Sequence, residues 1–125
     1  MLWQFFLVAL GGAMGASGRY GCSIIIRQQL TDNWPAATLL VNVVGSFGIG
    51  IAFVLLERGL VHTDMRALVV IGFFGAFTTF STFSLELLHM LQRGEFGQSL
   101  LYASLSLISC VAGAALGLLA ARAFT

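Results

Sequence analysis

Lysine is absent from this 125-residue sequence, proline occurs once, cysteine twice, and charged side chains make up only 9% of the residues. A soluble domain carries about 25% charged residues, so this chain has too few ionic groups to cover a surface in contact with water. Soluble enzymes and disordered regulators are therefore disfavoured, and the net charge of +1 offers no basic surface for nucleic acid. The apolar content of 58% indicates an integral membrane protein held in a lipid bilayer.

The residues that usually carry catalysis or bind metals are scarce and scattered. Cys22 and Cys110 lie in separate apolar stretches without the spacing of zinc or haem ligands, and we expect both to be small buried hydrophobic residues. His62 lies in a connector, and no second ligand completes a metal site near His89. Without a nucleophile–base pattern, phosphate loop or carboxylate pair, we expect no enzyme. Residues 1–18 carry no charged side chain and so do not resemble a cleaved signal peptide.

Four apolar stretches have about the length needed to cross a bilayer as helices, and short connectors between them hold most of the charge. We expect transmembrane spans at about residues 2–26, 36–56, 67–89 and 97–121, within one domain that covers residues 1–125. Period-two alternation is absent, which disfavours a β-barrel. The predicted fold class is therefore an all-α integral membrane protein with four transmembrane helices.

Small residues recur at helical spacing in the first and last spans. Gly11 and Gly15 are four residues apart, as are Gly113 and Gly117. Such pairs allow helix backbones to approach closely in lipid. The pattern favours close helix packing, either within one subunit or between subunits.

The arginines give no clear orientation in the membrane. With four spans, both termini and the second connector share one side, and the two sides carry nearly equal numbers of arginines. The first side has Arg58, Arg66 and Arg122, and the opposite side has Arg27, Arg93 and, if it extends outward, Arg19. Because orientation normally follows an excess of Lys and Arg, the near balance favours insertion in both directions and pairing of opposed copies, although another feature could fix one orientation. Four packed helices also leave little room for a pore, which favours a dimer.

The third span is unusual because five hydroxyl side chains fall within seven residues, 78–84, just after Gly75. Ser and Thr compete with the backbone for hydrogen bonds, and glycine adds flexibility. We therefore expect the helix to break mid-span between Gly75 and Thr79, where freed carbonyls would suit a cation and the restarting helix would offer N–H groups. The alternative is a continuous helix whose hydroxyls bond back to its own carbonyls.

Two aromatic residues, Phe80 and Phe83, lie three apart beside this hydroxyl run and share one helical face. Their ring edges carry the positive end of the aromatic quadrupole, so an anion could approach them without meeting a full charge. Packing in an apolar core is the alternative interpretation.

The second and fourth spans contain further polar residues. Asn42, with Thr38 one turn before it, either bonds a neighbouring helix or lines a path through the membrane. Tyr102, Ser106 and Cys110 follow at steps of four, which places them on one stripe that is either a polar track or a contact between helices.

Arg19 and Glu86 are the charges most embedded in apolar sequence. Ionisable residues within the membrane are functional candidates by default. Glu86 nevertheless lies toward the end of its span and Arg19 can extend to the interface, so each could equally be an interfacial anchor.

The segment Gly-Ala-Phe-Thr-Thr-Phe-Ser-Thr-Phe-Ser-Leu-Glu at residues 75–86 resembles the signature of the Fluc (CrcB) fluoride channel family. The resemblance extends along the chain, to the glycines of residues 11–19, to Thr-Leu-Leu-Val-Asn-Val-Val-Gly at residues 38–45 and to Arg93-Gly94. Two positions depart from it: Cys110 stands where serine is expected, and Ala76 where relatives often carry a second glycine. A thiol is the weaker hydrogen-bond donor.

This resemblance implies a passive channel that exports fluoride across the cytoplasmic membrane of a prokaryote, built as an antiparallel, dual-topology homodimer with two pores. It implies one structural sodium ion at the dimer centre, held by the backbone carbonyls of Gly75 and Thr78 from both subunits. It also implies ring-edge contacts from Phe80 and Phe83 to fluoride and a hydrogen bond from Asn42. The remaining pore residues would be Thr38, Ser81, Thr82, Tyr102, Ser106 and Cys110, with Arg19 and Glu86 at the pore ends.

The residue chemistry is compatible with fluoride, because a site must replace tightly held water with hydrogen-bond donors yet bind weakly enough to release the ion. Asn, Ser, Thr and Phe edges provide such donors, and the chain has no lysine to hold the anion too tightly. One alternative is a small multidrug-resistance exporter, but those proteins need a carboxylate in the first span, which this chain lacks. The other is a non-transporting assembly subunit, which would not need the hydroxyl run.

Overall fold

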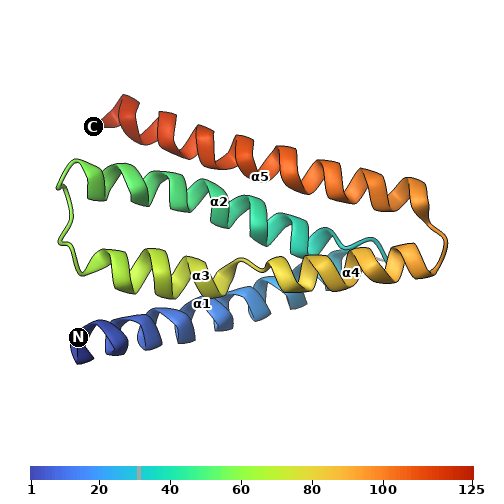
Figure 1. Ribbon diagram of the computed structural model, residues 1–125, viewed down its shortest axis with the longest axis horizontal. Coiled ribbons are helices and arrows are strands. Elements are labelled where there is room, and N and C mark those ends of the chain that lie inside the picture. The colour runs from blue at the N-terminus through green and yellow to red at the C-terminus, as the bar shows by residue number, and fades with distance from the viewer. Residues whose placement is uncertain (31) are drawn as a thin grey trace.

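The computed structural model describes residues 1–30 and 32–125, and these residues are helical apart from short connectors (Figure 1). The elements are α1 (Leu2–Gln29), α2 (Ala36–Glu57), the π-helix η1 (Arg66–Phe74), α3 (Gly75–Phe77), α4 (Phe80–Gln92) and α5 (Phe96–Phe124). Helices α1, α2 and α5 contain the predicted spans 2–26, 36–56 and 97–121, respectively. The predicted span 67–89 is distributed over η1, α3 and α4. Gly59 and Gly94, with φ of 65° and 75°, permit the left-handed turns that follow α2 and α4.

The helices run roughly along one long axis, with α2 packed along α5, and α1 packed along η1 and α3 (Figure 1). Both termini and the α2–η1 connector lie at one end of the molecule, and the α1–α2 and α4–α5 connectors lie at the other. At the terminal end, the carboxylate of Asp64 accepts hydrogen bonds from Trp3 Nε1 at 2.9 Å and from Gln4 Nε2 at 3.0 Å. These two bonds, aided by the nearby charge of His62, lower the pKa of Asp64.

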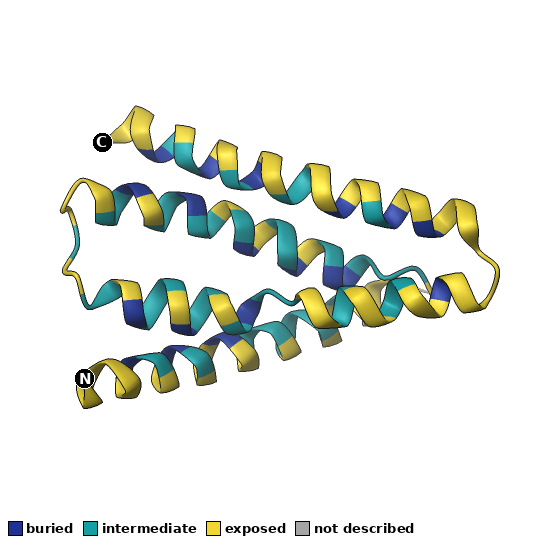
Figure 2. Ribbon diagram, viewed as in Figure 1, coloured by how far each residue is buried: buried dark blue, intermediate teal, exposed yellow. Residues whose placement is uncertain are grey.

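Three helical segments among the described residues are long and apolar enough to cross a membrane: Ala36–Glu57, Arg66–Gln92 and Phe96–Phe124. Helix α1 has a similar length of 28 residues, but its glycines and Arg19 make it less apolar. Exposed residues occur along every helix, and many of them are large and apolar (Figure 2). The chain is therefore a multi-pass membrane protein whose outer surface is suited to lipid or to another membrane-embedded chain.

The glycine pairs identified in the sequence act within the subunit. A Cβ atom on Gly11 would lie 1.9 Å from the Leu68 carbonyl oxygen, and one on Gly117 would lie 2.1 Å from that of Phe47. Both distances are far below van der Waals contact, so no larger residue fits without moving a backbone. These two positions therefore hold α1 against η1 and α5 against α2.

The segment Arg66–Gln92 contains an interruption between α3 and α4. Thr78 (φ −85°, ψ 159°) and Thr79 (φ −152°, ψ 114°) have extended backbone conformations, and α4 begins at Phe80. The helical hydrogen bonds that would cross these two residues are therefore partly replaced by other partners and partly lost.

Candidate functional site

Asn42 of α2 bonds directly to the extended backbone between α3 and α4. Its Oδ1 accepts from the N–H of Thr79 at 2.8 Å, and its Nδ2 donates to the Thr79 carbonyl at 3.1 Å. The Thr79 hydroxyl accepts from the Thr82 N–H at 3.1 Å and so caps the amino terminus of α4. Asn42 thus acts as a structural partner of the interruption, and among the described residues no acceptor takes its second amide proton.

The interruption frees carbonyl groups from their helical partners. The Ala76 carbonyl accepts a 3.0 Å hydrogen bond from Arg19 Nε of α1. In the described part of the chain, no hydrogen bond reaches the carbonyl oxygens of Gly75 or Thr78. The N–H of Thr79, which would bond to the Gly75 carbonyl in a continuous α-helix, is instead taken by Asn42.

On the side of α5, the interruption opens into a cavity of about 550 Å³. We call it the phenylalanine groove and define it by five of its lining residues, Asn42, Phe80, Phe83, Ser106 and Cys110. The Phe80 and Phe83 rings lie 5.5 Å apart between centroids and are tilted by 44°. Phe80 is 79% exposed, so the groove is open on that side of a single chain.

Ser106 is the polar residue of the groove with an unusual environment. Ser106 is only 8% exposed, and its hydroxyl has no hydrogen-bond partner within the described residues. A buried hydroxyl without a partner carries a desolvation penalty of about 1–3 kcal/mol. A hydrogen-bond partner for this hydroxyl would therefore lower the free energy of the folded state.

A second polar cluster surrounds Glu86 on α4. Its carboxylate accepts hydrogen bonds from the Thr38 hydroxyl at 2.5 Å and from the Tyr102 hydroxyl at 3.4 Å. The fully buried Tyr102 ring lies 5.1 Å from the ring of Phe83, which links this cluster to the groove. The ring of Trp34 also packs on that of Tyr102 in a T-shaped arrangement, at 5.3 Å between centroids.

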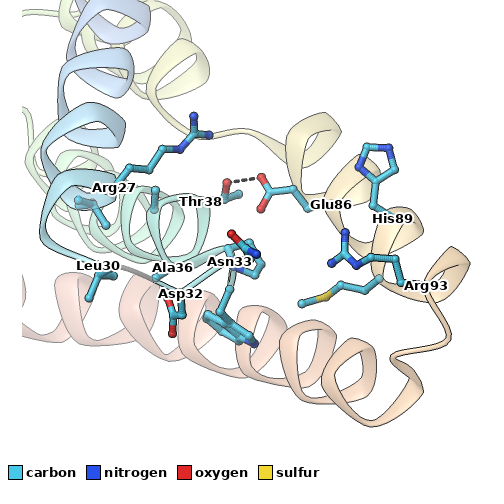
Figure 3. A pocket seen from close by; sticks show the side chains of 14 residues that line it. Arg27, Leu30, Asp32, Asn33, Ala36, Thr38, Glu86, His89 and Arg93 are labelled. Atoms are coloured by element: carbon cyan, nitrogen blue, oxygen red, sulfur yellow. Dashed lines mark hydrogen bonds between the residues drawn. The ribbon is translucent and has the colours of Figure 1, made fainter.

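Glu86 lies at one wall of a cavity of about 450 Å³ at the end of the molecule opposite the termini (Figure 3). Its lining includes charged and titratable residues from three parts of the chain, namely Arg27, Asp32, Glu86, His89 and Arg93. In Figure 3 the Glu86 side chain extends from α4 toward Thr38 on α2. Thr38 and Glu86 both line this cavity, so the Glu86 cluster is accessible from it.

The stripe Tyr102–Ser106–Cys110 divides between the two sites, since Tyr102 bonds to Glu86 whereas Ser106 and Cys110 line the groove. Thr82 lines neither the phenylalanine groove nor the cavity beside Glu86, but a smaller cavity beside α1. Ser81 is exposed, and its hydroxyl lies 3.4 Å from that of Thr79. Sequence reasoning missed the residues that the connectors contribute to the cavity beside Glu86, such as Asp32. Their only signal was charge near a span end, which is common in membrane proteins.

Comparisons with known proteins give a consistent result. Residues 6–118 match the family described as CrcB-like protein, Camphor Resistance (CrcB). A relative from Shewanella denitrificans is 46% identical over 108 residues, which cover 86% of this chain and 87% of the relative. A relative from Aeromonas salmonicida is 43% identical over 117 residues (93% and 92%), and one from Thermus thermophilus is 43% identical over 100 residues (80% of each).

All three relatives carry the name fluoride-specific ion channel FluC. The family match includes the interruption, the phenylalanine groove and the Glu86 cluster. Because it also covers nearly the whole chain, at high identity to several relatives, this protein belongs to the CrcB family.

Proposed function

We propose that this protein is a passive fluoride channel that lets fluoride leave the cytoplasm through the cytoplasmic membrane of a prokaryote. Membership of the CrcB family and the names of its relatives support this function. Fluoride enters cells as HF in acid surroundings and dissociates inside, so a passive anion pathway is sufficient to carry it out.

The observation that carries the proposal is the buried, unpartnered hydroxyl of Ser106 in a groove that also contains two phenylalanine rings. If the Ser106 side chain rotates toward the groove, a small anion there would accept its hydrogen bond and meet the positive edges of Phe80 and Phe83. The free amide proton of Asn42 adds a further donor. No lysine or arginine lines this groove in the described structure, so the anion would be held weakly enough to move on.

The working unit in this proposal is an antiparallel homodimer with two pores, in which α1 is the fourth transmembrane helix. The groove is open where Phe80 is exposed, so a second chain would complete its wall. Three arginines lie at or near the terminal end and two at the other, while Arg19 bonds to Ala76 inside the molecule and counts for neither side. This near balance supports insertion in both directions.

A sodium ion between the two chains is part of the same proposal. The carbonyls of Gly75 and Thr78 are among those that accept no hydrogen bond at the interruption within the described residues, and two per chain would make four oxygen ligands. Neutral carbonyls fit a monovalent cation better than a divalent one, because they cannot offset two charges. When bound, the ion would supply a positive charge and join the subunits.

The test is fluoride efflux from liposomes that contain the purified protein, measured with a fluoride electrode. We expect fluoride to flow down its gradient and to set a Nernst potential that an imposed proton gradient does not shift. A potential that follows the proton gradient would show that the protein is a coupled exporter and not a channel. Protein-free liposomes give the background, and absence of efflux above it would refute transport.

A further inference from the structure

Arg19 occupies an unusual place for a charged residue in a membrane protein. It lies ten residues before the end of α1 (Leu2–Gln29), which corresponds to about 15 Å along the helix and therefore to about half the thickness of the hydrocarbon layer. Its side chain does not extend toward either end of the molecule, because Nε donates to the Ala76 carbonyl at 3.0 Å. A charge at this depth is costly and calls for a specific reason.

The bond to Ala76 places a positive charge at the carboxyl end of the η1–α3 segment. That end carries the negative pole of the helix, and the interruption leaves its carbonyls without helical partners. The charge of Arg19 is not offset by an acidic partner, because the ion pairs found in the described part of the chain join other residues. The guanidinium therefore offsets part of the negative pole of this helix end and adds a positive charge beside the interruption.

The rest of the guanidinium faces a cavity of about 280 Å³ between α1, α2 and α4. Its polar lining includes Arg27 and the hydroxyls of Tyr20, Ser23, Thr79 and Thr82, and the described lining contains no carboxylate. Thr79 also lines the phenylalanine groove, so the two spaces meet at the same interruption.

We propose that Arg19 is a positioning residue that sets the anion affinity of the interruption through its charge, and not only through its hydrogen bond to Ala76. This inference rests on the proposed function, since it concerns the affinity for fluoride. A unit charge acting over roughly 10 Å at an effective dielectric constant of about 20 changes a binding constant by about one order of magnitude. Loss of the charge should therefore weaken fluoride binding at the interruption by about tenfold.

Two substitutions separate the charge from the hydrogen bond. Arg19→Lys and Arg19→Gln can both donate to the Ala76 carbonyl, but only Lys keeps the charge. In liposomes, we expect Arg19→Gln to raise the fluoride concentration at half-maximal flux by about tenfold and Arg19→Lys to change it by less than about threefold. Arg122→Gln is the matched control, because Arg122 pairs with Glu57 on the surface near the chain terminus and should leave this concentration unchanged.

A purely structural role would give a different pattern, in which both Arg19 variants lower the unfolding temperature and leave the half-saturating concentration as in the wild type. That result, or equal shifts in both variants, would overturn the inference. If Arg19→Gln does not assemble, the double variant Arg19→Gln/Ser23→Arg tests the inference instead, because it returns a positive charge to the same cavity one turn along α1. A half-saturating concentration within about threefold of the wild type supports the inference, and a tenfold increase contradicts it.

Failure of this inference can be told apart from failure of the proposed function. Absence of fluoride flux through the wild-type protein would remove the proposed function itself. Normal wild-type flux together with an unchanged half-saturating concentration in a folded Arg19→Gln variant would remove only the role of the Arg19 charge.

Discussion

The side chain of Asn42 closes a pair of hydrogen bonds with the backbone of Thr79, as a neighbouring β-strand would do. The two residues are 37 positions apart, and each supplies one donor and one acceptor to the other. An extended residue in the middle of a membrane protein needs partners for both backbone groups, and Asn42 provides both. The asparagine therefore maintains the interruption from the neighbouring helix.

Replacing Asn42 with leucine should remove both bonds and leave the N–H and carbonyl of Thr79 without partners. Each unsatisfied group costs about 1–3 kcal/mol, so we expect a lower unfolding temperature together with loss of fluoride flux. Ser109→Ala is a suitable control, because the Ser109 hydroxyl bonds to the Leu105 carbonyl of its own helix and, in the described part of the chain, to no other group. An Asn42→Leu variant with wild-type stability would contradict the structural role.

Phe80→Ile should abolish most fluoride flux while the protein still folds and dimerises. The substitution keeps a large apolar side chain but removes the positive ring edge, and Phe80 is 79% exposed, so little packing is lost within the chain. If the ring only fills space, the change should cost less than about 1.5 kcal/mol and leave flux intact. Flux measured in liposomes, with gel filtration to verify the dimer, distinguishes the two outcomes.

Ser106→Ala should reduce flux without reducing stability. The hydroxyl has no partner within the described residues, so its removal breaks no hydrogen bond and relieves a buried polar group. Thermal unfolding should therefore be unchanged or slightly raised while fluoride efflux falls. If stability falls by more than 1 kcal/mol or so, the hydroxyl has an internal partner and is not reserved for an ion.

Cys110→Ser gives the converse test in the same groove. It replaces a weak thiol donor with the hydroxyl expected from relatives, so flux should stay equal or increase. A marked decrease would mean that the thiol contributes something that a hydroxyl cannot.

Insertion in both directions can be tested by chemical labelling of the α2–η1 connector, where the side chain of His62 is 73% exposed. A single cysteine at His62, in a background with Cys22→Ala and Cys110→Ser, should react with a membrane-impermeant reagent in about half of the copies in intact cells. Labelling of all copies or of none would show one fixed orientation. Addition of two arginines to this connector should shift the labelled fraction strongly and make dimers scarce.

The sodium proposal predicts a contrast between two neighbouring positions. Thr78→Ser keeps the carbonyl and a similar backbone, so the dimer should retain its stability, whereas Gly75→Val adds a branched side chain beside a proposed ligand and should weaken the dimer. Dimer stability measured in sodium and in N-methylglucamine buffers tests the ion directly. Equal stability of the wild-type dimer in both buffers would remove the sodium ion from the proposal.

The sequence allowed much of this architecture to be anticipated, because long apolar runs between charged connectors follow the thickness of a bilayer. The helices extend beyond the predicted spans by up to three residues at an end, since residues such as Arg27 and Glu57 continue a helix readily. The family assignment confirms the resemblance seen in residues 75–86, and it also confirms that the protein is not an enzyme.

The contacts between distant segments could not be predicted in the same way. The position of Arg19 allowed either extension to the interface or a bond inside the molecule, and only the location of Ala76 distinguishes them. The sequence places the polar residues of α5 on one stripe, as either a polar track or a contact between helices, but its outer members, Tyr102 and Cys110, are eight residues and therefore about 12 Å apart. That distance is enough for Tyr102 to reach Glu86 while Cys110 lines the groove.

The position of the two termini at the same end of the molecule limits how two copies could be joined into one polypeptide. A short hydrophilic linker from Thr125 to the Met1 of a second copy would leave and re-enter on one side of the membrane, which holds the two copies parallel. An opposed pair within a single chain would require a linker that itself crosses the bilayer once. Gene duplication followed by simple fusion would therefore trap an antiparallel assembly in the wrong arrangement, whereas two separate genes with opposite charge bias would preserve it.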